Sequence, residues 1–469
     1  MVAEDNFIVA IVLGSSKITA VAGRKQPDGT IQVLAYAEEN SETFILRGRI
    51  NNVTKMKQCL INMKEKLEKT LKKTISHAYV GIGGMGMHTV ANTVIRQFGE
   101  KTVISEEIVD NMLQDNKASA SNDRFIYEVV PQEFKIGTQT QIDPVGIPTD
   151  CLEGRYLNII ANGNLREDID SCFRGALLKI AGLPISVLTL SDVILSESEK
   201  RSGCVFVDMG SETTSVAVFK NNVLRHFAVI PLGSANVNRD LSSLQIEDSE
   251  AEELKLQYGA ALYEGSLDDK SPVKLKDGRQ VKFEEFAGLV EARMEEIILN
   301  VYHQIELSKY DKSQLIGGII VTGGAANMKN IEKAFETHTH FEKMRFVSKG
   351  GLRTPIRSNS ADFNKDGIYN TALAIIDKAE FNCCGGGLGE DSQENIPSET
   401  PNEVEKSPIE ATATAASAAN EPEEQAEVRE EPKAKKQKAG VFRNFFKGFI
   451  DKMTDLVSEE DNTKSRKDA

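Results

Sequence analysis

Short apolar runs alternate with longer amphipathic stretches along the first 380 residues of the chain. Compact aliphatic runs predict buried strands, and apolar residues spaced three and four apart predict helices. The predicted strands are 7–13, 18–22, 78–82, 157–161, 205–209, 215–219 and 318–322. The predicted helices are 53–72, 166–181, 284–310 and 329–335. This alternation predicts an α/β fold.

Two of the predicted strand pairs resemble each other. "IVLGSSKITAVAG" (11–23) and "FVDMGSETTSVAVF" (206–219) both read as an aliphatic strand, a glycine, a serine, a polar pair and a second aliphatic strand. They lie about 195 residues apart, which suggests an internal duplication, although two short matches also arise by chance. A true duplication predicts two similar α/β halves that face each other across a cleft.

The first of these loops is Gly14-Ser15-Ser16-Lys17. Gly14 permits a tight turn, successive backbone N–H groups and serine hydroxyls can surround a phosphate, and Lys17 adds a positive charge. Taken alone, the pattern fits an ordinary hairpin at least as well as a phosphate site.

The second loop begins at Asp208 and contains Gly210, Ser211, Thr213 and Thr214. A carboxylate at the end of a strand, followed by glycine and hydroxyl residues, suits a hydrated Mg²⁺ beside a phosphate chain. We therefore expect Asp208 to hold Mg²⁺ through water and the other four residues to bind phosphate. The alternative is an acidic turn residue in a hairpin.

A third candidate is the turn that contains Gly323, Gly324 and Ala325, between a predicted strand and a predicted helix. Glycines there let a ligand approach the backbone, and small residues leave room for a base or a ribose. An adenosine contact is expected here, and a plain entry into a helix is the alternative.

Residues 248–259 are expected to form a short helix with Glu252 and Lys255 one turn apart on the same face. These two side chains either contact adenosine or form a solvated ion pair.

Composition narrows the classes of function. The net charge of −14 argues against a nucleic-acid partner for the whole chain. The six cysteines show no C-x-x-C pairing and predict reduced thiols rather than a metal site. The N-terminus does not look like a secretory signal, and no apolar run is long enough to predict a transmembrane helix.

The C-terminal part changes character. Residues 382–439 are rich in Glu, Pro, Ala and Thr and predict a disordered acidic linker, whereas 440–458 predict an amphipathic helix, followed by a polar tail at 459–469. Charges within the helix argue against a membrane span and favour an interfacial position, with a partner groove as the alternative. The expected lipid contacts are Phe442, Phe445, Phe446, Phe449, Ile450, Met453, Leu456 and Val457, with Arg443 and Lys447 beside them.

In combination, the three loops indicate a nucleotide site more specifically than any one of them does alone. Their order and spacing resemble the phosphate-1, phosphate-2 and adenosine motifs of the actin/Hsp70/hexokinase ATPase superfamily. The resemblance implies ATP and Mg²⁺ bound in a cleft between two halves. It also places a carboxylate where this chain has Val12, which cannot ligate Mg²⁺, so we expect slow or absent ATP hydrolysis and name no catalytic residue.

Within that superfamily the chain resembles the FtsA family of bacterial division actins. The resemblance rests on "AYVGIGGMGMH" (78–88), on Pro131-Gln132-Glu133-Phe134 and Asp143-Pro144-Val145-Gly146 within 129–161, and on "IPLGSANVNRDLSS" (230–243). It implies an actin-like fold with these subdomains: 6–84 with 163–201 (1A), 85–162 (1C, the FtsA-type extra subdomain), 202–232 with 317–381 (2A) and 233–316 (2B).

The same resemblance implies a function at the division site. The protein would form filaments with itself, bind FtsZ and tether its ring to the cytoplasmic face of the membrane through the C-terminal helix. Later division proteins would bind subdomain 1C. The alternatives are a PilM-like pilus adaptor and a sugar-kinase-like phosphotransferase, although the chain offers no candidate base for the latter.

Overall fold

The computed structural model divides the chain into two units, residues 1–395 and 396–469. It describes residues 6–119, 124–162, 164–265, 270–347, 351–360, 363 and 367–384, all within the first unit. The linker beyond 384, the predicted helix 440–458 with all its expected lipid contacts, and the tail 459–469 lie outside the described residues. Within the described ranges, no helix combines the length and the apolar character that a membrane crossing requires.

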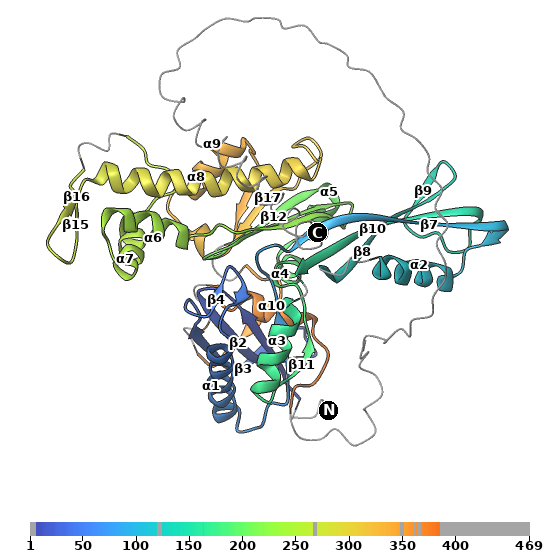
Figure 1. Cartoon of the computed structure of the whole chain (residues 1–469), viewed down its shortest axis with the longest axis horizontal. Helices are drawn as coiled ribbons and strands as arrows, with labels where there is room; N and C mark the ends of the chain where they lie inside the picture. Colours follow the sequence, from blue (N-terminus) through green and yellow to red (C-terminus); the bar gives the residue numbers. More distant parts are fainter. Residues whose placement is uncertain are drawn as a thin grey trace, which may run out of the picture. The chain divides into compact units, whose positions relative to one another are not determined.

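The first sheet lies in the N-terminal half and has the strand order β11-β6-β1-β2-β3-β19 (Figure 1). Its strands are β1 (Ile8–Leu13), β2 (Lys17–Lys25), β3 (Ile31–Asn40), β6 (His77–Gly81), β11 (Lys179–Gly182) and β19 (Ile356–Arg357). The short pair β4 (Ile45–Leu46) and β5 (Arg49–Ile50) follows β3 in the chain.

The second sheet starts with the strand order β18-β17-β12-β13-β14. Its strands are β12 (Cys204–Met209), β13 (Thr214–Lys220), β14 (Val223–Ile230), β17 (Gly318–Thr322) and β18 (Met344–Phe346). Neighbouring strands have the same relative directions as in the first sheet: β1 and β12 each run antiparallel to the next strand in the chain and parallel to a later one. The topology therefore confirms the predicted duplication.

The strand register shows which individual residues of the two halves are equivalent. Val12 pairs with Thr19 on β2 and with Gly81 on β6. Asp208 pairs with Ser215 on β13 and with Thr322 on β17. Val12 and Asp208 thus occupy the same place in their respective halves.

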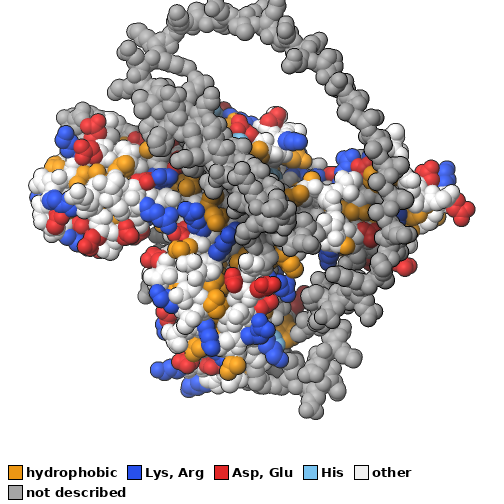
Figure 2. Space-filling model, in the orientation of Figure 1, with side chains coloured by type: hydrophobic (Ala, Val, Ile, Leu, Met, Phe, Trp, Pro, Cys, Tyr) orange, Lys and Arg blue, Asp and Glu red, His pale blue; other side chains and the backbone are white. Residues whose placement is uncertain are grey.

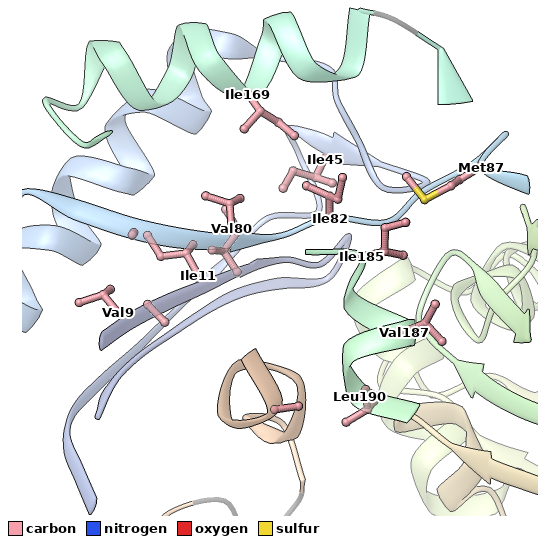
Figure 3. Packing of buried hydrophobic residues seen from close by; sticks show 14 of the residues in the cluster. Val9, Ile11, Ile45, Val80, Ile82, Met87, Ile169, Ile185, Val187 and Leu190 are labelled. Carbon is pink, nitrogen blue, oxygen red and sulfur yellow. The ribbon is translucent and has the colours of Figure 1, made fainter. Parts of the chain in front are cut away.

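Helices cover both sheets. The helices of the first half are α1 (Val53–Leu71), α3 (Asn164–Gly175), α4 (Ser186–Ile194) and α10 (Asn370–Lys378), and those of the second are α5 (Glu197–Ser202), α6 (Ala235–Leu241), α7 (Asp248–Tyr258), α8 (Phe283–Leu307) and α9 (Ile331–Thr339). Helix α1 packs on β3 and α3, and α10 packs on β1, β2 and α4. One apolar cluster runs from β1 through α4 to Phe206 and Phe219 of the second sheet, which joins the two halves. Figure 3 shows part of this cluster, including Val9 and Ile11 of β1 and Val187 and Leu190 of α4.

The second sheet continues into four further strands, β7 (His88–Val103), β10 (Pro148–Asn162), β8 (Arg124–Ile136) and β9 (Gln139–Gln141), with α2 (Glu106–Ala118) packed on β7. This is the extra subdomain, with its own small core that includes Met112, Leu152 and Tyr156. It meets β14 through hydrogen bonds between Thr89 and Phe227.

The segment Pro131–Phe134, on which the family resemblance partly rests, contributes to this attachment. Arg225 of β14 donates to the side chains of Gln132 and Glu133.

On the face of the molecule drawn in Figure 2, acidic and basic side chains intermingle over the described surface.

Several predicted boundaries differ from the structure, and three of these differences change the element or the part of the fold to which a segment belongs. The predicted helix 166–181 ends at Gly175, because Leu177 adopts a left-handed φ of 54° and the chain then forms β11. The segment 317–381 is predicted to belong wholly to subdomain 2A. Its strand β19 instead pairs with β3, and its helix α10 buries its apolar face on β1 and β2. This C-terminal part therefore returns to the first half.

The predicted linker also begins too early. Phe7 N–H donates to the side chain of Asn382, and Cys383 N–H donates to the carbonyl of Phe7 at 2.8 Å. Cys383 is fully buried, and Cys384 forms a bridge with Ile75. Residues 382–384 are part of the body because Cys383 packs as a small apolar side chain.

Candidate functional site

Asp208 stands at the end of β12, where the phosphate-2 loop begins. Its carboxylate is half-buried and forms no hydrogen bond or ion pair with any residue that the structure describes. The surrounding protein removes water from this carboxylate, which raises its pKa from 3.8 to about 6. A desolvated carboxylate without a positively charged partner is suited to a bound cation.

The turn after β17 lies directly against Asp208. Gly323 has a φ of 97°, and a Cβ built on it would lie 2.4 Å from the Met209 carbonyl oxygen and 2.6 Å from Asp208 Oδ1. Glycine is therefore required there. A Cβ on Gly324, by contrast, would meet no atom within 4 Å. The structure thus brings the second and third predicted loops together, while Ala325 packs into the apolar core.

The hydroxyl groups of the phosphate-2 loop fall into two classes. Ser211 and Thr213 are half-buried, and their hydroxyls bond to none of the described residues. Thr214 is fully buried in β13, and its Oγ1 donates to the carbonyl of Leu232 at 2.9 Å. Thr214 is therefore withdrawn from the predicted phosphate contacts, because its hydroxyl is already used inside the sheet.

Helices α6 and α7 extend the site on the side of the second half. At the start of α6, Ala235 N–H donates to the Ser211 carbonyl at 2.7 Å. Lys255 of α7 pairs with Glu252 at 2.5 Å and also donates to the carbonyl of Ser234. The predicted ion pair is confirmed but is only partly solvated, since Lys255 is buried whereas the Glu252 side chain is 46% exposed. Its contact with adenosine stays a prediction.

Asn238 of α6 is a residue that the sequence did not single out. Its Nδ2 donates to Glu252 Oε2 at 2.6 Å, on the same carboxylate oxygen that Lys255 binds. The other carboxylate oxygen of Glu252 has no hydrogen-bond partner among the described residues. The described residues therefore hold one carboxylate oxygen of Glu252 and do not hold the other.

The phosphate-1 loop is fixed mainly by its surroundings in the first half. Ser41 donates its hydroxyl to the Gly14 carbonyl at 2.7 Å, and Ser15 Oγ accepts a hydrogen bond from Gly48 N–H at 2.9 Å. The Ser16 hydroxyl bonds to none of the described residues. Lys17 is exposed and pairs with Glu38 at 3.5 Å, so its side chain can be released at little cost.

Loops 14–17 and 210–213 are joined through a turn that the sequence did not indicate, Arg47–Gly48. Gly48 binds Ser15, as above, and Arg47 N–H donates to the Glu212 carboxylate in the phosphate-2 loop. Arg239 of α6 forms an ion pair with the same carboxylate. No local pattern reveals these contacts, because the partners lie far apart in sequence.

Val12 lies at the position equivalent to Asp208 but has a different environment. It packs against the apolar cluster of α10, and its Cγ2 lies 3.4 Å from the point where a Cβ on Gly81 would be. The first half thus offers backbone amides and hydroxyls to this site but no carboxylate at the end of β1.

Together these segments carry the groups that the predicted polyphosphate and cation site requires. The Gly323 turn lies directly against Asp208, and the hydroxyls of Ser16, Ser211 and Thr213 bond to none of the described residues. Within the described part of the chain, no cluster of three or more His, Cys, Asp or Glu side chains forms a metal cage. A single carboxylate fits Mg²⁺, which keeps most of its water ligands in such sites.

Comparison with known proteins identifies the family. Residues 205–375 match the model of cell division protein FtsA, and residues 84–160 match the model of the SHS2 domain inserted in FtsA. The two matched segments together cover more than half of the chain. The second segment coincides with the extra subdomain seen in the structure.

Individual relatives extend the match. Cell division protein FtsA of Porphyromonas gingivalis is 27% identical over 339 residues, which cover 71% of this chain and 71% of the relative. FtsA of Neisseria meningitidis is 27% identical over 80% of this chain and 91% of the relative, and FtsA of Escherichia coli is 24% identical over 80% and 90%.

A solved structure supports the fold independently of sequence. A chain of the PilM–PilN type IV pilus biogenesis complex superposes with a TM-score of 0.54 at 13% identity, over 79% of this chain and 97% of that chain. At that identity the likeness concerns the actin-like fold alone. With the duplicated sheets, the extra subdomain and the matches above, the chain belongs to the FtsA family of actin-like cell division proteins.

Proposed function

We propose that this protein binds ATP with Mg²⁺, assembles into filaments and tethers the FtsZ ring to the cytoplasmic face of the membrane at the division site. Later division proteins would be recruited through the extra subdomain. One observation carries the nucleotide part of this proposal: Asp208 is desolvated, forms no hydrogen bond or ion pair with a described residue, and lies directly against the Gly323 turn.

The chain's own residues suit each part of the nucleotide. Ser16, Ser211 and Thr213 would bind the phosphates together with backbone N–H groups of their loops and, once released from Glu38, Lys17. Asp208 would hold Mg²⁺ through water, and the cation would neutralise the phosphate charge. Glu252, Lys255 and the turn 323–325 would bind the adenosine.

Hydrolysis is expected to be slow or absent. The first half has Val12 where the second has Asp208, so only one of these two equivalent positions supplies a carboxylate to organise the cation. Binding does not require the second carboxylate, because the amides and hydroxyls remain. Rapid steady-state ATP turnover by the purified protein would contradict this part of the proposal.

The membrane part of the proposal rests on the sequence of residues 440–458. Four phenylalanines on one helical stripe and basic residues beside it favour an interfacial helix. Deletion of 440–469 is expected to abolish co-sedimentation with anionic liposomes and to leave ATP affinity unchanged. Undiminished co-sedimentation of the shortened protein would exclude this role of the tail.

One experiment tests nucleotide, filament and membrane together. We expect electron microscopy to show filaments of the full chain on lipid monolayers in the presence of Mg·ATP. The Asp208→Ala variant is expected to lose them, and the protein without 440–469 is expected to leave the monolayer bare. Filaments of Asp208→Ala that match those of the unsubstituted protein would contradict the nucleotide assignment, and added FtsZ that fails to co-localise would contradict the tether.

A further inference from the structure

Within the described residues, the turn Arg47–Gly48 connects the two predicted phosphate loops directly. Both residues adopt left-handed backbone conformations, with φ of 51° and 74°. Gly48 N–H donates to Ser15 in the phosphate-1 loop, and Arg47 N–H donates to Glu212 in the phosphate-2 loop. A turn of two residues is therefore held from both halves of the molecule.

Glu212 is an unusual residue for a loop that faces phosphates. Its side chain is only 9% exposed, and its two oxygens accept from Arg47 N–H and from the Arg239 guanidinium. A buried carboxylate is stable only while such partners are in place. Because Glu212 stands between Ser211 and Thr213, any phosphate on those hydroxyls brings like charge next to this carboxylate.

The same turn also holds the start of the extra subdomain. Met85 N–H donates to the Arg47 carbonyl at 2.8 Å, and the Arg49 side chain donates to the Met85 carbonyl. A Cβ on Gly48 would lie 2.4 Å from the Cα of Gly84, so the two segments are in direct backbone contact. Two residues further, the Met87 carbonyl accepts from Val229 N–H of β14.

We propose that Glu212 is a positioning residue: it sets the Arg47–Gly48 turn according to whether phosphates are bound and thereby transmits nucleotide binding to Gly84–Met85 at the root of the extra subdomain. Phosphate binding beside Glu212 weakens its hold on Arg47 N–H, and the movement passes to Met85 through the Arg47 carbonyl. This inference rests on the proposed binding of ATP.

Hydrogen exchange of individual amides tests the link first in the nucleotide-free protein. Glu212→Ala is expected to speed exchange of the Arg47 and Met85 amides about 10-fold, the size of a lost hydrogen bond to a charged group. Glu212→Gln still offers an oxygen to Arg47 N–H and is expected to retain most of the protection. Glu199→Ala is the matched control, because Glu199 also accepts from a backbone N–H, that of Ser196, and from an arginine, Arg345. It should leave both amides unchanged.

The second arm adds saturating Mg·ATP. In the unsubstituted protein and in Glu199→Ala, exchange within residues 84–89 is expected to change at least about threefold, a coupling that the rate ratio measures directly. In Glu212→Ala this response should disappear, while ATP affinity stays within about threefold of the unsubstituted value. If Glu212→Ala does not fold, two other variants replace it in this experiment, Glu212→Gln and Arg239→Gln. Both are expected to weaken the response of residues 84–89 partly.

The possible results of the two exchange experiments either support or overturn the proposed role of Glu212. Unchanged exchange of Arg47 in nucleotide-free Glu212→Ala, or an ATP response of residues 84–89 that survives in this variant, overturns the inference. ATP binding by the unsubstituted protein without any response in 84–89 also overturns it and leaves the proposed function standing. Failure of the unsubstituted protein to bind ATP refutes the proposed function and the inference with it.

Discussion

The two duplicated sheets end differently at equivalent places. In the first half, the ends of the two central parallel strands carry Val12 and Gly81, followed by the fully buried Ile82. In the second half, the same places carry Asp208 and Thr322, followed by Gly323. The two halves share the backbone register, but the side chains at these places are apolar or absent in the first half and polar in the second.

The comparison indicates that the two halves of a duplicated fold can contribute different chemical groups to one site. The first half fills its strand ends with Val12 and Ile82, which pack against neighbouring apolar side chains. The second half packs the Gly323 turn directly against Asp208, whose carboxylate has no hydrogen-bond or ion-pair partner among the described residues. We infer that the first half mainly contributes backbone groups and hydroxyls, and that the second supplies the charge for the cation.

The largest effect is expected where this close approach of the Gly323 turn would be disturbed. Gly323→Ala places a Cβ against the Met209 carbonyl in a left-handed backbone conformation, and should lower the free energy of unfolding by about 3 kcal/mol or more. Gly324→Ala is the matched control and should cost less than about 1 kcal/mol, because its Cβ enters open space. Urea denaturation measures both, and equal stability of the two variants would contradict the close approach.

The next effect concerns the charge of Asp208. Its folded-state pKa, about 6, lies above the ordinary value of 3.8, so the nucleotide-free protein loses stability as pH rises through this interval. Asp208→Asn removes that loss and should raise the free energy of unfolding at pH 7 by about 1–3 kcal/mol, with no gain at pH 4. Urea denaturation at several pH values tests this, and a gain that is constant with pH would be the contrary result.

Transfer of the carboxylate to the first half should have a somewhat smaller effect. Val12→Asp places a charge beside the apolar cluster of α10 and should lower the free energy of unfolding by about 2 kcal/mol at pH 7. Val12→Asn, of similar volume, controls for the polar substitution without charge. If the variant binds ATP, we expect its turnover to change more than its affinity. Steady-state hydrolysis and equilibrium binding separate these quantities, and unaltered turnover would argue that Val12 is not what limits hydrolysis.

The smallest effect is expected at Lys17. Its ion pair with Glu38 is exposed, so Lys17→Met should change the free energy of unfolding by less than about 0.5 kcal/mol. If Lys17 contacts phosphate, ATP affinity should nevertheless fall, whereas Glu38→Gln should leave it unchanged or raise it slightly. Isothermal titration compares the two variants, and equal losses of affinity would show that the pair acts as a unit.

Much of the fold was predictable because its signals are local. Strand 318–322 and helix 53–72 follow directly from apolar spacing, and the repeated strand–glycine–strand pattern predicted the duplicated sheets that the topology confirms. The meeting of Asp208 with the Gly323 turn followed from the family resemblance, since the two are more than a hundred residues apart in the chain.

What the sequence could not predict depends on contacts between distant segments. The return of α10 to the first sheet is decided by the apolar surface of β1 and β2, which α10 covers. The bonds of Glu212 to Arg47 and Arg239 follow from the way the two halves meet, and the pattern around residue 212 reads only as a polar loop. Thr214 shows the same limit, since its hydroxyl looks available until the strand places it inside the sheet.

The docking of Asn382–Cys384 beside Phe7 has a mechanical consequence. Any pull exerted on the chain beyond residue 384 reaches the folded body through this segment. The force therefore falls first on the hydrogen bonds to Phe7 and Ser76 and on the bridge to Ile75. These bonds attach directly to the start of β1 and to the strand beside it, so tension from the C-terminal side is delivered to the central strands of the first half.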